Sequence, residues 1–327
     1  MVRKLAGKYH SGDIPHLEVN NNKITDIQDI SNELAHTFSD NSSSHNYNAR
    51  FQSFRIQAET QHLRFKSNNN EPYNNPFSIE ELTDAISKAH DTAVGPDDIH
   101  YQMLKHLPNE ALQTLLGALN DIWYSGNFPD SWRTSTVIPV PKPGKDKSDS
   151  SNYRPIALTS CICKIMERMI NNRLVWYLER NNFITPVQSG FRKQRSTTDH
   201  LVRLESFVRE AFVQRQHAVA IFFDLEKAYE RTWKYGIMKD LHNAGLRGRL
   251  PCFIEGFLRN RNFCVRLGSC LSDLHEQEMG VPQGSILSVT LFGLKINSIV
   301  KAISPGVDCS LYVDDFLICY RSKHTHH

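Results

Sequence analysis

The segment Leu311-Tyr312-Val313-Asp314-Asp315-Phe316-Leu317-Ile318-Cys319 places two adjacent carboxylates inside an apolar run. Strand-forming residues over 309–312 and 316–320 predict a β-hairpin whose turn is the Asp314-Asp315 pair. Unpaired Asp is rarely buried, and neighbouring carboxylates repel each other. A fold that holds both at one turn is expected to offset the repulsion with bound cations, which indicates phosphoryl-transfer chemistry. A solvated turn is the alternative interpretation, which the apolar flanks disfavour.

A third carboxylate has the position of a partner for this pair. The apolar run 218–223 has the length of a strand and stops at Asp224, so Asp224 is expected at the rim of a sheet. If its strand neighbours the hairpin, Asp224 and Asp314 can hold two metal ions about 3.5–4 Å apart, one activating the attacking hydroxyl and one stabilising the leaving phosphate. Oxygen ligands favour Mg²⁺ or Mn²⁺ over zinc. An ordinary strand-end Asp in a turn is the alternative.

Composition describes an ordinary globular chain. It has 327 residues, 40% hydrophobic and 22% charged, enough for one large or two average domains. No apolar run approaches the ~18 residues of a membrane span, and no apolar core of a signal peptide follows the basic N-terminus. Seven scattered cysteines complete no zinc pattern. We expect an intracellular protein with reduced thiols, in the nucleus or the cytoplasm. A net charge of +3 is only weak evidence for nucleic-acid binding, so such binding must be argued from local clusters of basic residues.

The distribution of polar and apolar residues divides the chain near residue 76. Residues 1–76 are polar and rich in Asn, which predicts a partly disordered connector with one short helix along the stripe Ile27, Ile30, Leu34 and Phe38. A capping box from Ser78 to Glu81 then starts a folded domain over 77–327. From residue 131 onward, strand-length runs alternate with helical periodicity and close on the hairpin. This order predicts an α+β fold with helices packed on one face of a sheet.

Two further segments are candidates for binding. Gly280-Val281-Pro282-Gln283-Gly284-Ser285 is a constrained turn where backbone can approach a ligand closely, and the long amide of Gln283 must find partners there or face something polar. The basic stretch that contains Lys142 and Arg154 suits a triphosphate or a nucleic-acid backbone. A capped loop and a solvated surface loop are the respective alternatives.

Together these segments resemble the motifs of reverse transcriptases. Tyr312-Val313-Asp314-Asp315 resembles their Tyr-x-Asp-Asp box, the segment 223–229 their first catalytic-aspartate motif, and the segment 280–285 the box between the two. Finer features resemble the non-LTR, jockey-like retrotransposon branch: Gly95-Pro96-Asp97, Asn152-Tyr153-Arg154-Pro155-Ile156 and Gln188-Ser189-Gly190-Phe191-Arg192. The resemblance extends from about residue 80 to the C-terminus and implies a mobile-element enzyme.

The resemblance implies an RNA-directed DNA polymerase, a nucleotidyltransferase. Its fold would comprise right-hand fingers and palm over 77–327, with core motifs over 131–327 and an antiparallel palm sheet. Asp224 and Asp314 would ligate two Mg²⁺ ions, with Mn²⁺ possible, and Asp315 would assist. RNA template, DNA primer and dNTPs would be the partners, because template pairing supplies sequence choice and the protein needs only shape and backbone contacts.

Four residues acquire nucleotide-binding roles from the same resemblance. Lys142 and Arg154 would grip the incoming triphosphate, and Gln283 would lie in the nucleotide pocket. Tyr229 would be the steric gate that excludes a ribose 2′-OH.

Two departures from the family pattern stand out. Asp98 occupies a position where Gly is usual, and a positive φ there would be a strain that Asp tolerates better than most residues. The chain also stops 12 residues after Asp315. The sequence therefore predicts a chain truncated after the Tyr-x-Asp-Asp motif, with the thumb absent. Two interpretations remain open: a polymerase fragment, and a retroelement relic that folds and binds nucleic acid without polymerising.

Overall fold

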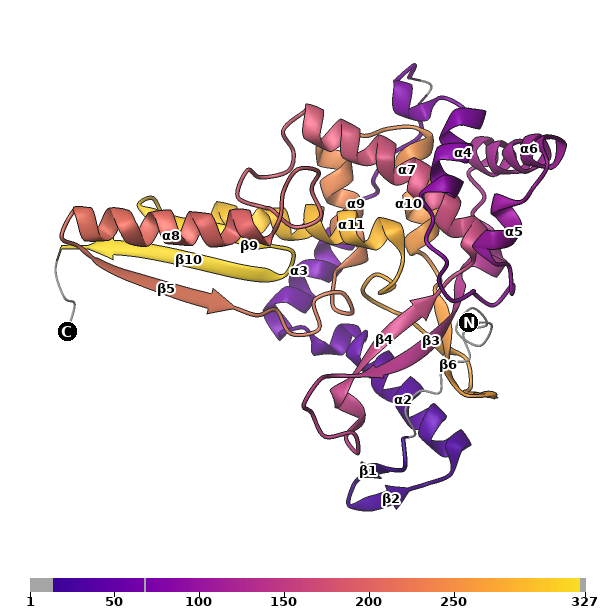
Figure 1. Ribbon diagram of the computed structural model, residues 1–327, viewed down its shortest axis with the longest axis horizontal. Helices are drawn as coiled ribbons and strands as arrows, with labels where there is room; N and C mark the ends of the chain where they lie inside the picture. Colours follow the sequence, from indigo (N-terminus) through magenta and orange to yellow (C-terminus); the bar gives the residue numbers. More distant parts are fainter. Residues whose placement is uncertain (1–13, 68, 324–327) are drawn as a thin grey trace. The chain divides into compact units, whose positions relative to one another are not determined.

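The computed structural model describes residues 14–67 and 69–323, and the basic N-terminal segment considered above lies outside them. The fold is mixed α+β, with its elements ordered along the chain as Figure 1 shows. It divides into two compact units, Met1–Leu174 with Tyr229–Ser288 and Val175–Ala228 with Val289–His327. The chain thus leaves the first unit after residue 174, returns at 229 and leaves again after 288.

The first unit is built on a five-stranded mixed sheet of order β4-β3-β6-β7, with β8 also paired to β6. β3 pairs antiparallel with β4 and parallel with β6. Its strands are β3 (Thr134–Pro141), β4 (Tyr153–Leu158), β6 (Asn262–Leu267), β7 (Cys270–Leu271) and β8 (His275–Glu276). The strand expected near residues 137–140 is therefore present as β3.

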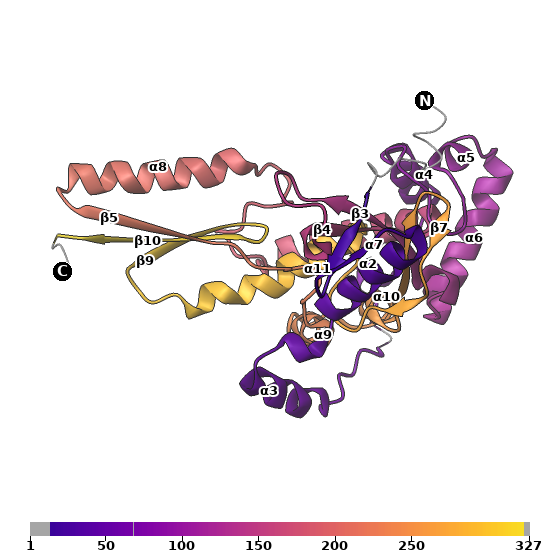
Figure 2. The ribbon, with the colours of Figure 1, turned by 90° about the horizontal axis from the view of Figure 1, so that it is seen from below.

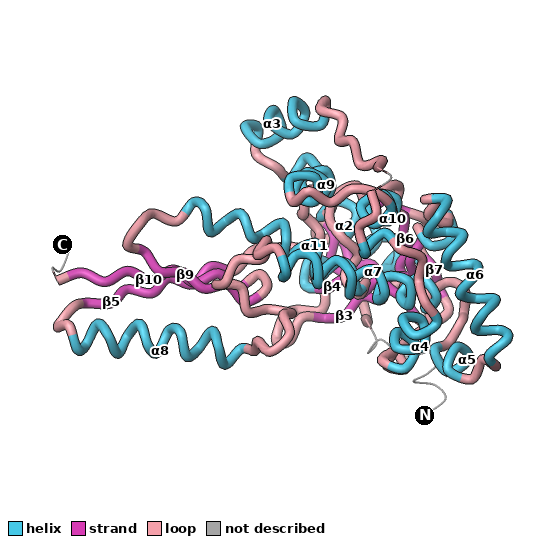
Figure 3. Tube along the Cα trace, turned by 90° about the horizontal axis from the view of Figure 1, so that it is seen from above, coloured by secondary structure: helices cyan, strands magenta, loops and turns pink. Residues whose placement is uncertain are grey.

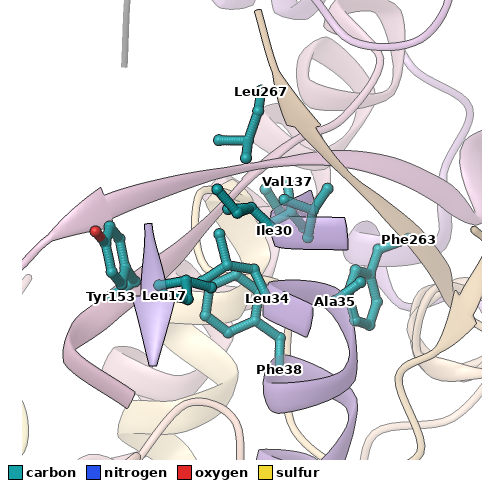
Figure 4. Close-up of a cluster of buried hydrophobic side chains, with 11 residues drawn as sticks. Leu17, Ile30, Leu34, Ala35, Phe38, Val137, Tyr153, Phe263 and Leu267 are labelled. Carbon is teal, nitrogen blue, oxygen red and sulfur yellow. The ribbon is translucent and has the colours of Figure 1, made fainter. Parts of the chain in front are cut away.

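An N-terminal helix closes one face of this sheet. Ile30, Leu34 and Phe38 of α2 (Ile27–Asn41) are buried against residues of β3, β4 and β6, as Figure 4 shows, whereas Ile27 is 52% exposed. The apolar stripe therefore belongs to the core of the first unit. The described part of 14–76 also contains the hairpin β1 (Leu17–Val19) and β2 (Asn22–Ile24) and a second helix, α3 (Ala49–Glu59), where the sequence predicted one helix. The boundary at residue 76 stays a prediction.

Further helices complete the first unit. The predicted capping box is confirmed: Ser78 Oγ accepts from the Glu81 amide, and the Glu81 carboxylate accepts from the Ser78 amide, at the start of α4. The helices are α4 (Ile79–Ser87), α5 (Tyr101–Lys105), α6 (Asn109–Ser125), α9 (Lys234–Asn243) and α10 (Arg249–Leu258). Two more, α7 (Cys161–Arg180) and α11 (Ile286–Ile296), begin in the first unit and end in the second. Short 3-10 turns link several of them.

The turn over residues 95–98 contains one residue with a positive φ and one that must be glycine. Asp98 has φ +53°, so it adopts the strained conformation that the sequence left conditional. A Cβ on Gly95 would lie 2.5 Å from the carbonyl carbon of Thr159 and 2.6 Å from the amide of Ser160. Gly95 is therefore required because this turn packs directly on the backbone between β4 and α7.

The second unit holds a three-stranded antiparallel sheet of order β5-β10-β9. The strands are β5 (His217–Phe223), β9 (Val307–Tyr312) and β10 (Asp315–Ser322). Helix α8 (Thr197–Val213) contacts all three strands and runs along them, as Figures 2 and 3 show. Phe207 of α8 packs on Leu317 and Cys319 of β10. β5 is an edge strand whose apolar side chains are all exposed.

None of the described helices has both the length and the apolar character that crossing a membrane requires. All seven cysteines are free thiols, as the scattered spacing predicted.

Candidate active site

The hairpin that carries the two aspartates has a two-residue turn. Tyr312 pairs with Asp315, so the turn consists of Val313 and Asp314, and Asp315 is the first residue of β10. The prediction that both aspartates form the turn is therefore wrong for Asp315. The physical reason is the strand register. Because Tyr312 pairs with Asp315, only the two residues between them remain for the turn. Asp314 is half-buried and Asp315 is exposed.

Asp224 reaches this hairpin through strand pairing. β5 and β10 are neighbours, and Phe223 pairs with Phe316 at the end of the ladder. One further step along the same antiparallel register brings Asp224 opposite Asp315. The condition set by the sequence, that the strand before Asp224 neighbours the hairpin, is met. Asp224 is exposed, as a residue just beyond a strand end usually is.

These three carboxylates offer the hard oxygen ligands that Mg²⁺ prefers. Across the described residues, no group of three or more His, Cys, Asp or Glu side chains is gathered closely enough to enclose a metal ion. An open carboxylate site still fits Mg²⁺, because this ion is usually held by one or two carboxylates together with substrate phosphates and water. These three carboxylates therefore suit an ion whose other ligands come from a nucleotide. They suit a permanently bound ion that is enclosed by protein ligands less well.

His200 of α8 lies beside the same hairpin. Its Nδ1 and Ser310 Oγ are 2.7 Å apart, and its ring centroid is 6.5 Å from that of Tyr312. Burial lowers the pKa of His200 below its usual value, the Asp315 carboxylate opposes that effect, and Arg203 reinforces it. The Asp315 charge is thus close enough to influence a side chain of the helix that covers the sheet.

Two predicted nucleotide-binding residues share one end of the β3–β4 hairpin. Val140 pairs with Arg154, and the Lys142 amide continues the ladder by donating to the Asn152 carbonyl at 2.8 Å. Lys142 lies two residues beyond Val140, so its side chain and that of Arg154 emerge on the same face. Arg154 is exposed, and Lys142 Nζ donates to the Ser151 carbonyl at 3.1 Å.

Gln283 is held against the same hairpin by its backbone. Its carbonyl accepts from the Ala157 amide at 2.7 Å. Gly284 adopts φ +122°, and a Cβ there would lie 2.6 Å from the Ala157 carbonyl oxygen, so the close approach expected of this glycine turn is made to β4. The side-chain Oε1 of Gln283 is buried without a hydrogen-bond partner among the described residues. Gln283 is one of the residues that line a cavity of about 30 Å³, together with Pro155 and Pro282.

Tyr229 lies on a segment that is bonded to the start of the same turn. Its carbonyl accepts from the Val281 amide at 2.9 Å, and the Gly280 amide donates to the Thr232 carbonyl at 2.8 Å. A Cβ on Gly280, where φ is +79°, would lie 2.4 Å from the Glu230 carbonyl oxygen. Tyr229 and Gln283 therefore belong to two connected segments of the first unit, while the three aspartates belong to the second.

Sequence reasoning missed the residue that supports the turn 280–285. Glu167 of α7 is 0% exposed, and its carboxylate accepts hydrogen bonds from the Ser285 hydroxyl, from the Ile286 amide at 2.9 Å and from the Leu287 amide at 3.3 Å. It thereby caps the N-terminus of α11, where a negative charge is favourable. The available signal was a Glu on the apolar side of a helical pattern, next to Ile165 and Met166.

Comparison with known proteins places the chain in a family. Residues 140–327 match the model of the family described as Reverse transcriptase (RNA-dependent DNA polymerase). The matched range covers more than half of the 327 residues and includes all seven predicted site residues. The chain therefore belongs to the reverse transcriptase family.

Its relatives are the polymerases of non-LTR retrotransposons, which confirms the resemblance found in the motifs. The chain is 32% identical over 254 residues to the RNA-directed DNA polymerase from mobile element jockey of Drosophila funebris, covering 76% of this chain and 28% of the relative. It is 31% identical over 263 residues to the probable RNA-directed DNA polymerase from transposon X-element of Drosophila melanogaster, covering 77% and 28%.

A more distant match is the Pol polyprotein from type-1 retrotransposable element R2 of Popillia japonica, 24% identical over 243 residues, with 71% of this chain and 32% of the relative covered. The chain thus spans less than a third of the length of each of these relatives.

Proposed function

We propose that this chain is the part of an RNA-directed DNA polymerase that adds deoxynucleotides to a DNA primer 3′-OH on an RNA template. The observation that supports this most is the register of β5, β10 and β9, which aligns Asp224 with Asp315 and leaves Asp314 in the adjacent turn. Membership of the reverse transcriptase family supports the same chemistry. In-line phosphoryl transfer requires positioning and electrostatics more than covalent chemistry, and such a carboxylate group can supply both.

The three aspartates take the role of metal ligands in this proposal. Asp224 and Asp314 hold the divalent ions, and Asp315 assists from the first position of β10. Bound Mg²⁺ supplies Lewis-acid stabilisation of the attacking and leaving oxygens. The contribution of the protein is to keep the carboxylates at neighbouring strand ends, where the sheet restricts their backbones.

The first unit supplies the nucleotide contacts. Lys142 and Arg154 share one face of the β3–β4 hairpin and provide two positive charges for the triphosphate. Gln283, which is only partly buried as a residue, takes a position beside the base pair of template and incoming nucleotide. Tyr229 excludes the ribose 2′-OH. In this assignment the β5-β10-β9 sheet with α8 is part of a palm, and the β3–β4 hairpin is part of the fingers.

Primer extension tests the proposal. The purified chain, given a primed RNA template, dNTPs and Mg²⁺, is expected to extend the primer, and Asp314→Asn is expected to abolish extension. Asp308→Asn is the matched control, because Asp308 is an exposed aspartate at the far end of the same hairpin. Extension that survives Asp314→Asn would refute the assignment of the site. RNA binding with no incorporation by the wild-type chain would favour the non-catalytic relic instead.

The steric gate has its own readout. Tyr229→Val is expected to raise the kcat/KM for ribonucleotides relative to deoxynucleotides, because the smaller side chain leaves space for the 2′-OH. A ratio unchanged from that of the wild-type chain would remove Tyr229 from this role, while leaving the metal-ligand assignment intact.

A further inference from the structure

The turn between Tyr312 and Asp315 contains a strained residue. Val313 has φ +61°. The two-residue turns that hairpins favour, types I′ and II′, have a positive φ at their first central position, which Gly, Asn and Asp adopt readily. A β-branched residue adopts it at a cost, because its Cβ crowds the backbone. The chain must therefore hold Val313 in place by other contacts, next to the Asp314 backbone whose direction it sets.

The side chain of Gln188 makes those contacts. Its Oε1 accepts from the Val313 amide at 3.0 Å, and its Nε2 donates to the Val313 carbonyl at 3.3 Å. One side-chain amide thus satisfies both backbone groups of the strained residue. Gln188 lies 125 residues from Val313 in the chain and is only 3% exposed. A side chain buried to this extent is directed at the protein interior and is not available to a nucleic acid.

The neighbours of Gln188 keep its segment on the hairpin. The Ser189 amide donates to the Leu311 carbonyl, and the Leu311 amide donates to the Val187 carbonyl, both at 2.9 Å. These bonds form a short parallel bridge between Gln188 and Leu311. The segment is therefore paired to β9 immediately before the turn, so that the Gln188 side chain reaches Val313 without a long, flexible path.

Gly190 provides the space for this arrangement. Its amide donates to Gln188 Oε1 at 2.8 Å, which orients the acceptor. A Cβ at this position would lie 2.5 Å from the Val313 amide nitrogen and 2.5 Å from Val313 Cγ2. Only glycine allows the loop to approach the turn this closely.

A partly buried arginine anchors the loop at its other end. Arg192 makes a two-pronged ion pair with Glu179 at the end of α7, at 2.8 and 2.6 Å. It also donates to the carbonyls of Thr185 at 2.9 Å and Gln188 at 3.0 Å. The chain of contacts therefore runs from a helix end, through Arg192 and Gln188, to the turn.

We propose that Gln188 is a positioning residue that holds the Val313-Asp314 turn in its strained conformation and so fixes the direction of the Asp314 carboxylate. This inference rests on the proposed polymerase function for its kinetic consequence, but the clamp itself is a property of the second unit. Nothing in the residue types of the 188–192 segment alone indicates this role; it follows from the contacts with Val313.

The first test replaces the amide by an apolar chain of the same length. Gln188→Met is expected to lower kcat for primer extension by about 10- to 100-fold, with the KM for dNTP nearly unchanged, because misplacing a reacting group by about 1 Å has effects of this size. Gln188→Glu keeps an acceptor for the Val313 amide, but it replaces the Nε2 donor with an oxygen that faces the Val313 carbonyl and adds a negative charge, so a loss of kcat is expected here too. Gln214→Met is the matched control, since Gln214 is exposed at the C-terminal cap of α8.

The second test needs no catalysis. Amide hydrogen exchange at Val313, followed by NMR on valine-labelled protein, is expected to accelerate in Gln188→Met, to accelerate less in Gln188→Glu, and to stay unchanged in Gln214→Met. Wild-type kcat together with wild-type exchange in Gln188→Met would overturn the proposal. If the wild-type chain extends no primer, the polymerase function fails, and Val313 exchange still decides whether Gln188 holds the turn. If Gln188→Met does not fold, Gln188→Glu decides on the same two readouts.

A double-mutant cycle separates the clamp from general stabilisation. Asn tolerates a positive φ, so Val313→Asn relieves the strain that Gln188 opposes. The loss of kcat caused by Gln188→Met is therefore expected to be several-fold smaller in the Val313→Asn background than in the wild-type background. Equal losses in the two backgrounds would show that Gln188 does not act through the conformation of residue 313.

Discussion

Among the substitutions in the first unit, Glu167→Gln is expected to cause the largest loss of stability. Substituting Gln keeps the size of the side chain and one acceptor oxygen but removes the charge at the N-terminus of α11. Three groups donate to the Oε2 of Glu167, namely the Ser285 hydroxyl and the amides of Ile286 and Leu287, and they then meet a neutral oxygen. A buried charge beside a helix N-terminus contributes up to about 2 kcal/mol.

The second contribution comes from Arg261, which is 1% exposed. Burial lowers the pKa of its guanidinium below the usual value, and the nearby Cys163 and Glu167 oppose that effect. Removing the Glu167 charge leaves this buried cation with less compensation, a change that costs about 3–5 kcal/mol when a direct partner is deleted and less at longer range. We therefore expect Glu167→Gln to lower the free energy of unfolding by about 3 kcal/mol.

Urea unfolding followed by tryptophan fluorescence measures this change. In a Trp176→Phe background every remaining tryptophan lies in the first unit: Trp123, Trp132 and Trp233. The matched control is Glu110→Gln, which removes an exposed carboxylate from the first turn of α6 and is expected to cost less than about 1 kcal/mol. A loss for Glu167→Gln no larger than that of the control would refute the reasoning, because burial would then add nothing to the cap.

Three other substitutions give independent checks. Gly117→Ala, on the exposed face of α6 with nothing within 4 Å of the new Cβ, is expected to raise the free energy of unfolding by about 0.5–1 kcal/mol in a urea titration; a decrease would contradict the helical geometry. Gly284→Ala is expected to destabilise the first unit by more than 1 kcal/mol, on the order of the strain of a φ that L residues rarely adopt, and to lower dNTP affinity, because its Cβ would meet the Ala157 carbonyl; a melting temperature equal to that of the wild type would disprove the close approach. Burial lowers the pKa of Lys234 to about 7, so the folded state binds fewer protons than the unfolded state above that pH, and stability should rise with pH from about 7 toward the usual pKa of about 10.4. Lys234→Met should flatten that rise in pH-dependent unfolding, and an unaltered pH profile would count against the burial of this amine.

Local patterns were enough to predict several of the individual elements. Alternating and continuous apolar runs predicted the strands at 137–140 and 218–223, and the capping box at Ser78 predicted the start of α4. Such features depend on residues a few positions apart, whose side chains and amides interact wherever the element is placed.

These local patterns could not predict how distant segments pair with each other. The exact end of the hairpin is one example: apolar flanks indicated a turn at Asp314 and Asp315, but inter-strand register placed Asp315 inside β10. Gln283 is another: its type predicted that the long amide either finds partners or faces something polar, and only the structure showed that the described chain leaves Oε1 without a hydrogen-bond partner. Register and burial depend on the whole sheet, and a one-residue shift changes which side chains face one another.

The sequence by itself determined the membership of the reverse transcriptase family, the mixed α+β class and the presence of three carboxylates at a strand end and a hairpin turn, because ordered motifs and short-range periodicity are written in consecutive residues. Only the tertiary structure decided which side chains support the turns near these motifs. Gln188 hydrogen-bonds to Val313, 125 residues away, and Glu167 accepts from the Ile286 amide at the start of α11, 119 residues away. Each of these contacts joins segments that no local pattern links, since a glutamine or glutamate on a loop or helix can hydrogen-bond to many amides. The fold selects one partner by bringing a single strained turn or helix end within reach of it.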